Sequence, residues 1–209
     1  MRYSYASENI IMCDDFLPPH ILQNIKSDLH RNINSFSEPE WSGINKATQK
    51  LERFSTYNKN CGGYDYWINF GESPESNKNI LDLESRFYHQ GFFTFLESQG
   101  RDNVFKFLRK NKTHAIHVVS YNNNGYYDWH ADTQFFTFNL IINESDELSG
   151  GDMLFMDEGR TIEISSRNNL MVVFPSYIHH AITPIRSKSG KDVPFTQQRF
   201  SIQYWVKCS

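Results

Sequence analysis

The sequence predicts a mostly β protein with supporting α-helices: a double-stranded β-helix (jelly roll) core with N-terminal helices packed against it. Two observations lead to this fold class. Before residue 112 the apolar positions favour amphipathic helices, and after it they alternate with a period of two, as in half-buried strands. Turn signals such as Ser149-Gly150-Gly151 separate the alternating runs. We therefore expect 1–209 to form one domain, with a helical and loop-rich part over 1–112 and the jelly roll over 113–207.

The expected N-terminal elements follow from apolar spacing and from helix start and stop signals. Pro18-Pro19 begins a helix whose face carries Ile21, Leu22, Ile25 and Leu29. Gly91 is a weak point in a longer helical run that stops at Gly100. In chain order we expect a strand over 9–16, a helix from 19 to about 32, a helix over 79–99 and a short helix over 102–110.

The segment 35–75 has weak periodicity and many Ser, Asn, Gly and aromatic residues, which indicates loops and short strands. Loops carried on a rigid scaffold often bind substrate, so we interpret this segment as a substrate lid. Its aromatic candidates are Trp41, Tyr57, Tyr64, Tyr66 and Trp67.

The C-terminal part reads as a series of short strands. The run THAIHVVSY places Ala115, His117, Val119 and Tyr121 on one face, because side chains two apart point the same way in a strand. Many short strands with turn signals between them are typical of a sandwich or barrel. The expected strands cover 113–121, 135–143, 152–156, 161–164, 170–175, 180–185 and 199–206.

Composition limits the function classes. Hydrophobic residues make up 39% and aromatic residues 15%, enough for a packed core, and the net charge is −3 without a block of like charges. This pattern disfavours nucleic acid and anionic membranes as partners. The three scattered cysteines, Cys13, Cys61 and Cys208, indicate a reducing compartment. With no leader-like start and no apolar run of about 18 residues, we expect a cytoplasmic protein. The sequence leaves the oligomeric state open.

The sequence offers a metal-binding pattern in two parts. His130 and Asp132 form an H-x-D pair, whose side chains reach the same side of a strand or strand-end bend. A further imidazole comes from His179 or His180, which are adjacent. Two imidazoles and one carboxylate on one face of an iron, with open positions opposite, are the facial triad of non-haem Fe(II) oxygenases.

The motifs from Tyr121 onward keep a recognisable order. A Tyr stands nine residues before the H-x-D pair, and G-G-x-x-x-F, F-P-S with a distal His, and R-F-S on a strand with a late Trp follow. Together they resemble the Fe(II)/2-oxoglutarate-dependent dioxygenases, specifically the prolyl-4-hydroxylase-like branch. Two departures are Gly125, one residue nearer to His130 than usual, and an insertion over 186–198. The matching residues are Tyr121, Tyr127, His130, Asp132, Leu140, Gly150, Gly151, Phe155, Phe174, Pro175, Ser176, His180, Arg199, Phe200, Ser201 and Trp205.

The resemblance implies Fe(II) and 2-oxoglutarate as cofactors, with ascorbate as a further candidate. It implies that Arg199 binds the far carboxylate of 2-oxoglutarate through its planar donor fork, with Tyr121 and Ser201 beside it. Arg199 and Ser201 share a strand face with Gln203 and Trp205, whereas Phe200, Ile202, Tyr204 and Val206 form the apolar face.

Several assignments keep an alternative. The family register favours His180 over His179 as the distal ligand, and both cannot ligate from a regular strand. Lys188 and Lys191 are alternatives to Arg199, although they lie in a loop-like stretch that favours solvation. His117 shares the face of Tyr121, and a core histidine with satisfied hydrogen bonds is favoured over a pocket residue. Trp129 and Trp205 are interpreted as packing residues.

The resemblance implies an enzyme that hydroxylates an unactivated C–H bond and releases succinate and CO2. No catalytic residue beyond the metal ligands is assigned. The first substrate hypothesis is a prolyl residue of a peptide or protein, and the alternative is a free amino acid or other small molecule. A nucleic-acid demethylase is disfavoured, because the last strand carries one Arg where that branch has a second. A non-catalytic jelly-roll binding module and a cupin-type enzyme without 2-oxoglutarate are the other classes considered.

Overall fold

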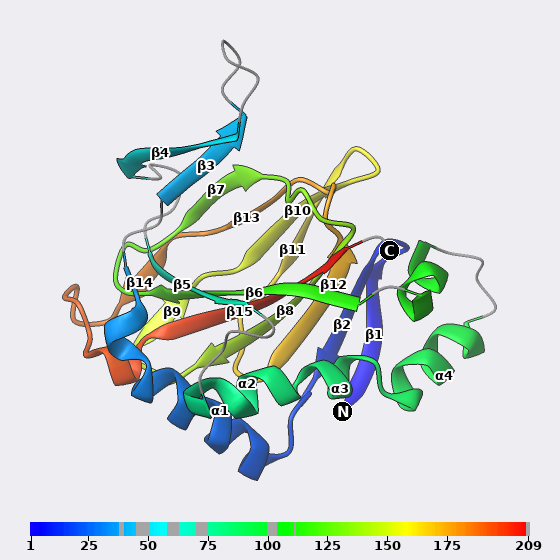
Figure 1. Ribbon diagram of the computed structural model, residues 1–209, viewed down its shortest axis with the longest axis horizontal. Helices are drawn as coiled ribbons and strands as arrows, with labels where there is room; N and C mark the ends of the chain where they lie inside the picture. Colours follow the sequence, from blue (N-terminus) through cyan, green and yellow to red (C-terminus); the bar gives the residue numbers. More distant parts are fainter. Residues whose placement is uncertain are drawn as a thin grey trace.

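The chain folds into stacked antiparallel sheets with helices along one side (Figure 1). It is mostly β, as the sequence predicts, and every strand pair between described residues is antiparallel. Within the described part, no helix is both long and apolar enough to cross a membrane. A computed structural model describes residues 1–37, 40–44, 51–57, 63–69, 75–99, 104–110 and 112–207.

Most strands lie after residue 111, and all the described α-helices precede it. The strands are β1 (Arg2–Ser7), β2 (Ile10–Asp14), β3 (Glu40–Ile44), β4 (Leu51–Tyr57), β5 (Tyr64–Asn69), β6 (Lys112–Tyr121), β7 (Tyr127–His130), β8 (Phe136–Asn143), β9 (Leu148–Gly150), β10 (Met153–Asp157), β11 (Arg160–Ile164), β12 (Leu170–Pro175), β13 (His180–Ile182), β14 (Ile185–Ser187) and β15 (Arg199–Lys207). The α-helices are α1 (Pro19–Arg31), α2 (Lys78–Asp82), α3 (Glu84–Phe87) and α4 (Gln90–Ser98), with 3-10 turns at Ile33–Ser35, Glu75–Asn77, Val104–Lys110 and Phe195–Gln197.

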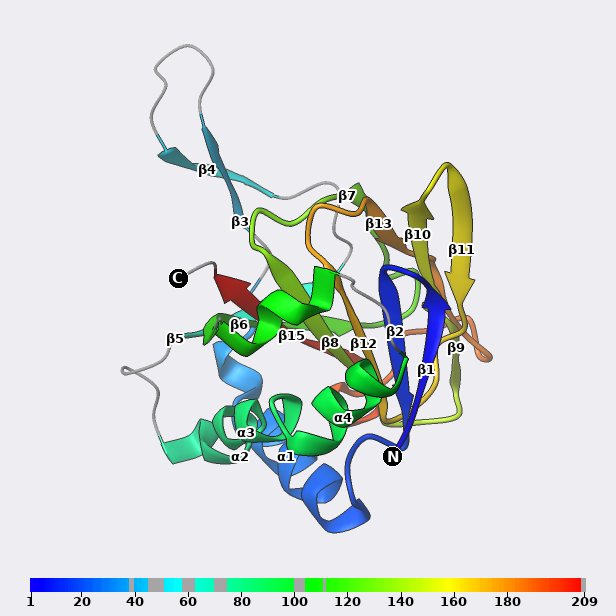
Figure 2. The ribbon, with the colours of Figure 1, turned by 90° about the vertical axis from the view of Figure 1, so that its right-hand side faces the viewer.

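Two sheets form the jelly-roll core. The large sheet has the strand order β1-β2-β12-β8-β15-β6-β5, and the small sheet has the order β11-β10-β13-β7. Figure 2 shows the small sheet on one side of the large sheet and the helices on the other. Ile141 and Phe174 of the large sheet share an apolar cluster with Phe155 and Ile182 of the small one. The inner face of the large sheet therefore faces the small sheet.

The outer face of the large sheet packs against the helices. Ile25 and Leu29 of α1 are buried in one cluster with Phe138 of β8 and Ile202 of β15. Burying each such side chain is worth about 1.5–3 kcal/mol. The predicted apolar face of the last strand is confirmed, because Phe200, Ile202, Tyr204 and Val206 all belong to this cluster.

The helix expected over 79–99 is interrupted, which the sequence did not show. Tyr88 ends α3 and His89 has extended backbone, with φ −74° and ψ 148°. Nδ1 of His89 accepts a hydrogen bond from the backbone N–H of Gly91 at 2.9 Å, so His89 acts as the N-cap of α4. A Cβ on Gly91 would lie 2.3 Å from the His89 ring. Gly91 thus permits a second helix start rather than weakening one long helix.

Two other boundaries differ from expectation. The strand expected over 180–185 is divided into β13 and β14, which pair with different partners, β10 and β9. Pro184 lies between them and has no N–H to donate, so the ladder cannot continue through it. The short helix expected over 102–110 is a 3-10 helix from Val104, and residues 102–103 lie outside the described part.

The predicted lid segment 35–75 falls only partly within the described residues. β3 and β4 form an antiparallel hairpin, and β5 is the edge strand of the large sheet. Both views show the hairpin projecting beyond the two sheets on the side of β7 (Figures 1 and 2). Residues 38–39, 45–50, 58–62 and 70–74 lie outside the described part, so the lid prediction remains an expectation.

Phe87 is the centre of the aromatic packing between helices and sheet. Its ring stacks on Phe16 at 5.2 Å and meets Tyr204 edge-on at 4.5 Å. We expect Phe87→Ala to lower the free energy of unfolding by about 3–5 kcal/mol, because it leaves a cavity in a packed core. Phe107→Ala is the matched control, since that ring is 46% exposed, and it should change stability by less than about 1 kcal/mol. Urea denaturation measures both; equal losses would contradict this picture of the core.

Candidate active site

Three side chains with metal-binding atoms meet between the two sheets. His130 is the last residue of β7, Asp132 lies in the bend after it, and His180 is the first residue of β13. His130 and His180 are register partners in the β7–β13 ladder. One ligand atom from each of the three residues lies within 4.8 Å of the other two. Fifty residues of sequence separate the two histidines, and the strand pairing brings them together.

Backbone carbonyls fix the orientation of both imidazoles. Nδ1 of His130 donates to the carbonyl of Asp128 at 2.7 Å, and Nδ1 of His180 donates to the carbonyl of Ile178 at 2.9 Å. The lone pair on Nε2 is then free for a metal in both rings. Each Nε2 lies 3.8 Å from an oxygen of the Asp132 carboxylate. Three donors converging in this way form a candidate metal site.

The Asp132 carboxylate is also held in place. Its Oδ2 accepts a hydrogen bond from Oγ1 of Thr137 at 2.7 Å, and its backbone N–H donates to the carbonyl of Ser176 at 2.9 Å. The Thr137 hydroxyl also contacts that of Ser176 at 2.9 Å. Thr137 and Ser176 thus form an outer shell around the metal site. No motif in the sequence pointed to Thr137, whose only local signal is its place on an alternating strand.

Burial keeps His130 in the form that binds metals. Desolvation, together with the nearby His180, lowers the pKa of His130 to about 4, and Asp132 opposes this shift. At neutral pH the imidazole is therefore unprotonated and its Nε2 lone pair is available.

The two adjacent histidines differ in environment. His180 is buried, with the ring of Phe174 packed edge-on at 4.7 Å. His179 is exposed, and its carbonyl accepts a hydrogen bond from the backbone N–H of Met156. His180 begins β13 and His179 lies just before it, and of the two only the His180 side chain joins His130 and Asp132.

The donor set fits Fe(II) by its chemistry. Two imidazole nitrogens and one carboxylate on the same side of the ion leave the opposite positions open, as in non-haem iron oxygenases. A structural zinc site, by contrast, is usually closed by a fourth protein ligand. Within the described part of the chain, no other group of three or more His, Cys, Asp or Glu residues converges in this way.

Arg199 is buried on the inner face of the large sheet, at the start of β15. Its Nε donates to Oγ of Ser166 at 3.2 Å and its Nη2 donates to the carbonyl of Gly151 at 3.1 Å. Nη1 is buried without a hydrogen-bond partner among the described residues. Burial lowers the pKa of Arg199 to about 10, so it stays cationic at neutral pH. An unpartnered buried donor on a fixed cation fits an incoming carboxylate.

The other two predicted co-substrate residues lie beside Arg199. Tyr121 is its register partner on β6, and the guanidinium carbon lies 5.2 Å from the centre of the Tyr121 ring. Ser201 is two residues further along the same face, and its hydroxyl donates to Oδ1 of Asn139 at 2.6 Å. The structure thus gathers all three residues on one face, and the insertion over 186–198 leaves the pairing of Arg199 with Tyr121 in place.

Gly151 is in direct contact with the Arg199 side chain. The sequence indicated only a turn at this position. Its φ is +71°, and a Cβ there would lie 2.9 Å from Nε of Arg199. Only glycine fits both the left-handed backbone and the close approach of the guanidinium. The alternative cations, Lys188 and Lys191, are exposed, so neither shares the buried position of Arg199.

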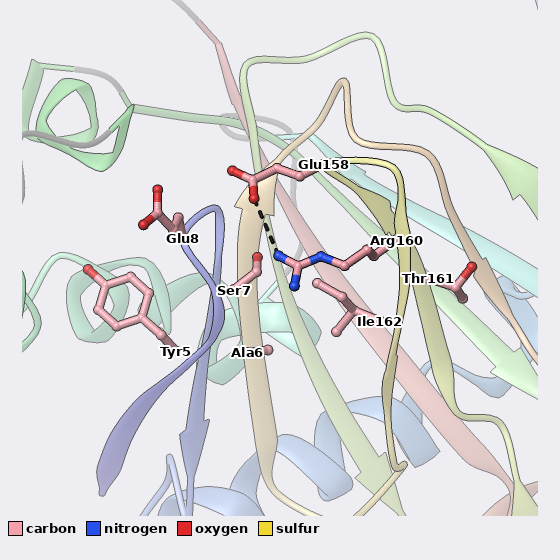
Figure 3. A pocket seen from close by; sticks show the side chains of 8 residues that line it. All are labelled: Tyr5, Ala6, Ser7, Glu8, Glu158, Arg160, Thr161 and Ile162. Atoms are coloured by element: carbon pink, nitrogen blue, oxygen red, sulfur yellow. Dashed lines mark hydrogen bonds and ion pairs between the residues drawn. The ribbon is translucent and has the colours of Figure 1, made fainter.

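A surface depression on another part of the molecule contains none of the predicted site residues. It has a volume of about 450 Å³ and lies between the β1–β2 turn and the β10–β11 hairpin (Figure 3). Glu158 and Arg160 form an ion pair of 3.5 Å on its wall. We therefore locate the active site at the convergent side chains between the sheets instead.

The fold and the site together define a metal-binding double-stranded β-helix with a buried cation beside the metal group. Residues 116–207 match the model of the 2OG-Fe(II) oxygenase superfamily. The matched region contains His130, Asp132 and His180, so the match and the convergent side chains both support Fe(II)- and 2-oxoglutarate-dependent oxygenase chemistry. No curated protein sequence matches the chain.

Solved structures share the fold at low sequence identity. One is a prolyl hydroxylase from Trichoplax adhaerens in complex with a peptide fragment of hypoxia inducible factor, with 16% identity, 96% of this chain and 84% of that chain covered, and a TM-score of 0.67. A prolyl-4-hydroxylase from Pseudomonas putida is 15% identical, with 98% of this chain and 95% of that chain covered and a TM-score of 0.58. A viral collagen prolyl hydroxylase from Paramecium bursaria Chlorella virus-1, in a 2OG complex, is 15% identical. In that comparison 96% of this chain and 97% of that chain are covered, and the TM-score is 0.54.

Proposed function

We propose that this protein hydroxylates a prolyl residue of a peptide or protein, with Fe(II) held by His130, Asp132 and His180. The observation that carries the proposal is the convergence of these three ligands within 4.8 Å, next to a sheet face that carries a buried Arg199. Similarity to prolyl hydroxylases, one of them bound to a peptide, supports the choice of substrate.

Each protein group has a distinct role in this proposal. Nη1 of Arg199 would donate to the far carboxylate of 2-oxoglutarate, beside the ring of Tyr121. Thr137 keeps Asp132 oriented toward the metal. When bound, Fe(II), 2-oxoglutarate and O2 supply the oxidation, in which 2-oxoglutarate becomes succinate and CO2 and a substrate C–H becomes C–OH. Phe155 and Phe174 pack against the ring of His180 and shield that side of the centre from water.

The first experiment is an anaerobic titration of the metal-free protein with Fe(II) and then 2-oxoglutarate, followed by the weak visible charge-transfer band of the chelate. We expect the band to appear only when both are present. The protein is then incubated in air with an acetyl-decaproline amide and analysed by mass spectrometry. We expect one or more oxygen atoms added to proline, with equimolar succinate.

The two stages separate the parts of the proposal. A protein that binds Fe(II) but shows no band with 2-oxoglutarate would overturn the placement of the co-substrate. A band without oxidised proline in this peptide or in a set of proline-containing sequences would overturn the prolyl substrate alone. An alanine decapeptide of the same length is the control for uncoupled turnover.

A further inference from the structure

The inner face of the large sheet continues past the metal centre into a polar and aromatic area. Register partners on β8, β15, β6 and β5 form rows across this face (Figure 1). One row consists of Asn139, Gln203, His117 and Trp67. Arg199 belongs to another row, about 13 Å further along the strands by the rise per residue. The sheet face therefore has a co-substrate end and a second end.

The second end lies next to the metal ligands. Thr137, which donates to Asp132, is the register partner of Trp205. Trp205 follows Gln203 by two residues and so points to the same face. A molecule that lay on Gln203 and Trp205 would thus have the metal centre beside it.

Asp65 and His117 hold this area together. Nε2 of His117 lies 3.0 Å from Oδ2 of Asp65, and its Nδ1 lies 3.3 Å from Oε1 of Gln203. Nε1 of Trp67 donates to the same Asp65 oxygen at 3.3 Å. His117 is thus a buried histidine with both nitrogens in contact with partners, as the favoured sequence interpretation predicts. Its effect is to fix the amide of Gln203 in one position.

Three aromatic rings form the wall of this area. The Trp67 and His117 rings stack at 4.2 Å with planes 17° apart, and Trp205 meets Trp67 edge-on at 4.9 Å. Trp67 is 43% exposed although it sits on the inner face of the sheet. An exposed indole fixed by stacking and by a hydrogen bond is an accessible apolar surface for a ligand.

Two hydrogen-bond donors in this area lack partners. The described residues offer none to Nε1 of Trp205, which is buried, or to Nε2 of Gln203. From the sequence, Trp205 is interpreted as a packing residue, but packing alone leaves its N–H without a hydrogen bond. Buried donors in native proteins normally have partners. The buried N–H of Trp205, with the amide of Gln203 two residues away on the same face, fits a ligand that brings carbonyl oxygens.

The charged side chains described on this face already have partners or lie at its other end. Among its described residues, Asp65 is bound by His117 and Trp67, and Arg199 lies at the co-substrate end. A free amino acid carries an ammonium and a carboxylate, and burying either without an opposite charge is costly. A peptide segment instead brings neutral amides, whose carbonyls can accept from Gln203 and Trp205.

We infer that Gln203 and Trp205, with Trp67 as the apolar wall, form a substrate subsite that selects an amide-bearing peptide segment over a free amino acid. This inference rests on the proposed function, since the subsite serves the same metal centre. Asp65 and His117 are positioning residues that act through Gln203.

The first test compares matched probes. Each proteinogenic amino acid is supplied as the free zwitterion and as its N-acetyl amide, and the holoenzyme's consumption of 2-oxoglutarate is measured. We expect stimulation by at least one N-acetyl amide and, at the same concentration, at least about tenfold less by its free form. Equal stimulation by free amino acids would overturn the inference. So would a protein that forms the Fe(II)/2-oxoglutarate chelate but responds to no amide, whereas failure to form the chelate would refute the proposed function itself.

The second test changes the donors while keeping their shape. Gln203→Glu retains an oxygen for His117 and removes the NH2 group, and Trp205→Phe keeps an aromatic ring without the N–H. We expect each to raise KM for the stimulating amide about tenfold while leaving the affinity for 2-oxoglutarate unchanged. Gln23→Glu, on the exposed face of α1, is the matched control for the added charge. Should Gln203→Glu fail to fold, an unchanged KM in Trp205→Phe would still overturn the inference.

The positioning of Gln203 by His117 can be tested separately, through KM and kcat of His117 variants. His117→Phe keeps a ring against Trp67 but removes both hydrogen bonds, and it should raise KM for the amide with kcat within about twofold of wild type. His117→Gln, which retains hydrogen-bonding atoms, should recover part of that loss. A purely structural role would instead lower the amount of active enzyme, and thus kcat, without changing KM.

Discussion

His180→Ala and Asp132→Ala are each expected to lower the affinity for Fe(II) and the turnover of 2-oxoglutarate by at least about 100-fold. Loss of even an outer-shell partner of a metal ligand typically costs about 10–100-fold, and here a ligand itself is removed. The effect should be large because the three donors converge within 4.8 Å and, among the described residues, no other side chain stands ready to replace one. Anaerobic Fe(II) titration and succinate formation measure the two losses.

The adjacent histidine provides a close control for this result. His179 is exposed while His180 is buried, so His179→Ala should keep Fe(II) affinity within about twofold of wild type. The thermal midpoint of each metal-free variant shows whether it is folded. If His179→Ala lost iron and His180→Ala kept it, the placement of β13 and the ligand set would both be wrong.

Arg199→Ala is expected to raise the apparent dissociation constant for 2-oxoglutarate by about 100-fold or more, with Fe(II) affinity unchanged. Each hydrogen bond to a charged group contributes about 1.5–3 kcal/mol, and a buried guanidinium offers more than one. The unpartnered Nη1 is the group whose loss should matter most. Titration of the chelate band with 2-oxoglutarate at saturating Fe(II) measures the change.

A conservative variant and a control variant test whether the effect is specific to the Arg199 guanidinium. Arg199→Lys keeps a positive charge without the planar fork, so it should recover only part of the affinity. Arg186→Ala is the control, because Arg186 is an exposed arginine on the neighbouring β14. An Arg199→Ala protein with normal affinity for 2-oxoglutarate would show that the co-substrate carboxylate binds elsewhere.

Local pattern was enough to predict much of this site. The H-x-D pair depends on the alternation of side chains within a few residues, and so does the face that Arg199 shares with Ser201 and Gln203. The strand over 170–175 could be predicted as well, because an unbroken apolar run between turn signals has few other structures available. Similarity to a known family then connected these local signals into one ligand set.

Contacts between distant segments could not be predicted in this way. Asp65 and His117 are 52 residues apart in sequence, and only the pairing of β5 with β6 makes them neighbours. The helix break at His89 depends on one side chain capping the next helix, against a spacing that favours continuity. Gly151 looked like a turn residue because its contact with Arg199 depends on the tertiary fold.

The alternation along β15 also makes the active site intolerant of a slip in strand register. Shifting this strand by one residue would turn Phe200 and Ile202 toward the inner face of the large sheet and bury Arg199 and Ser201 against the helices. Such a misfolded chain would lose its hydrophobic packing together with its cation. Because one strand register sets both the core packing and the position of Arg199, we expect a change in register to reduce stability and activity together.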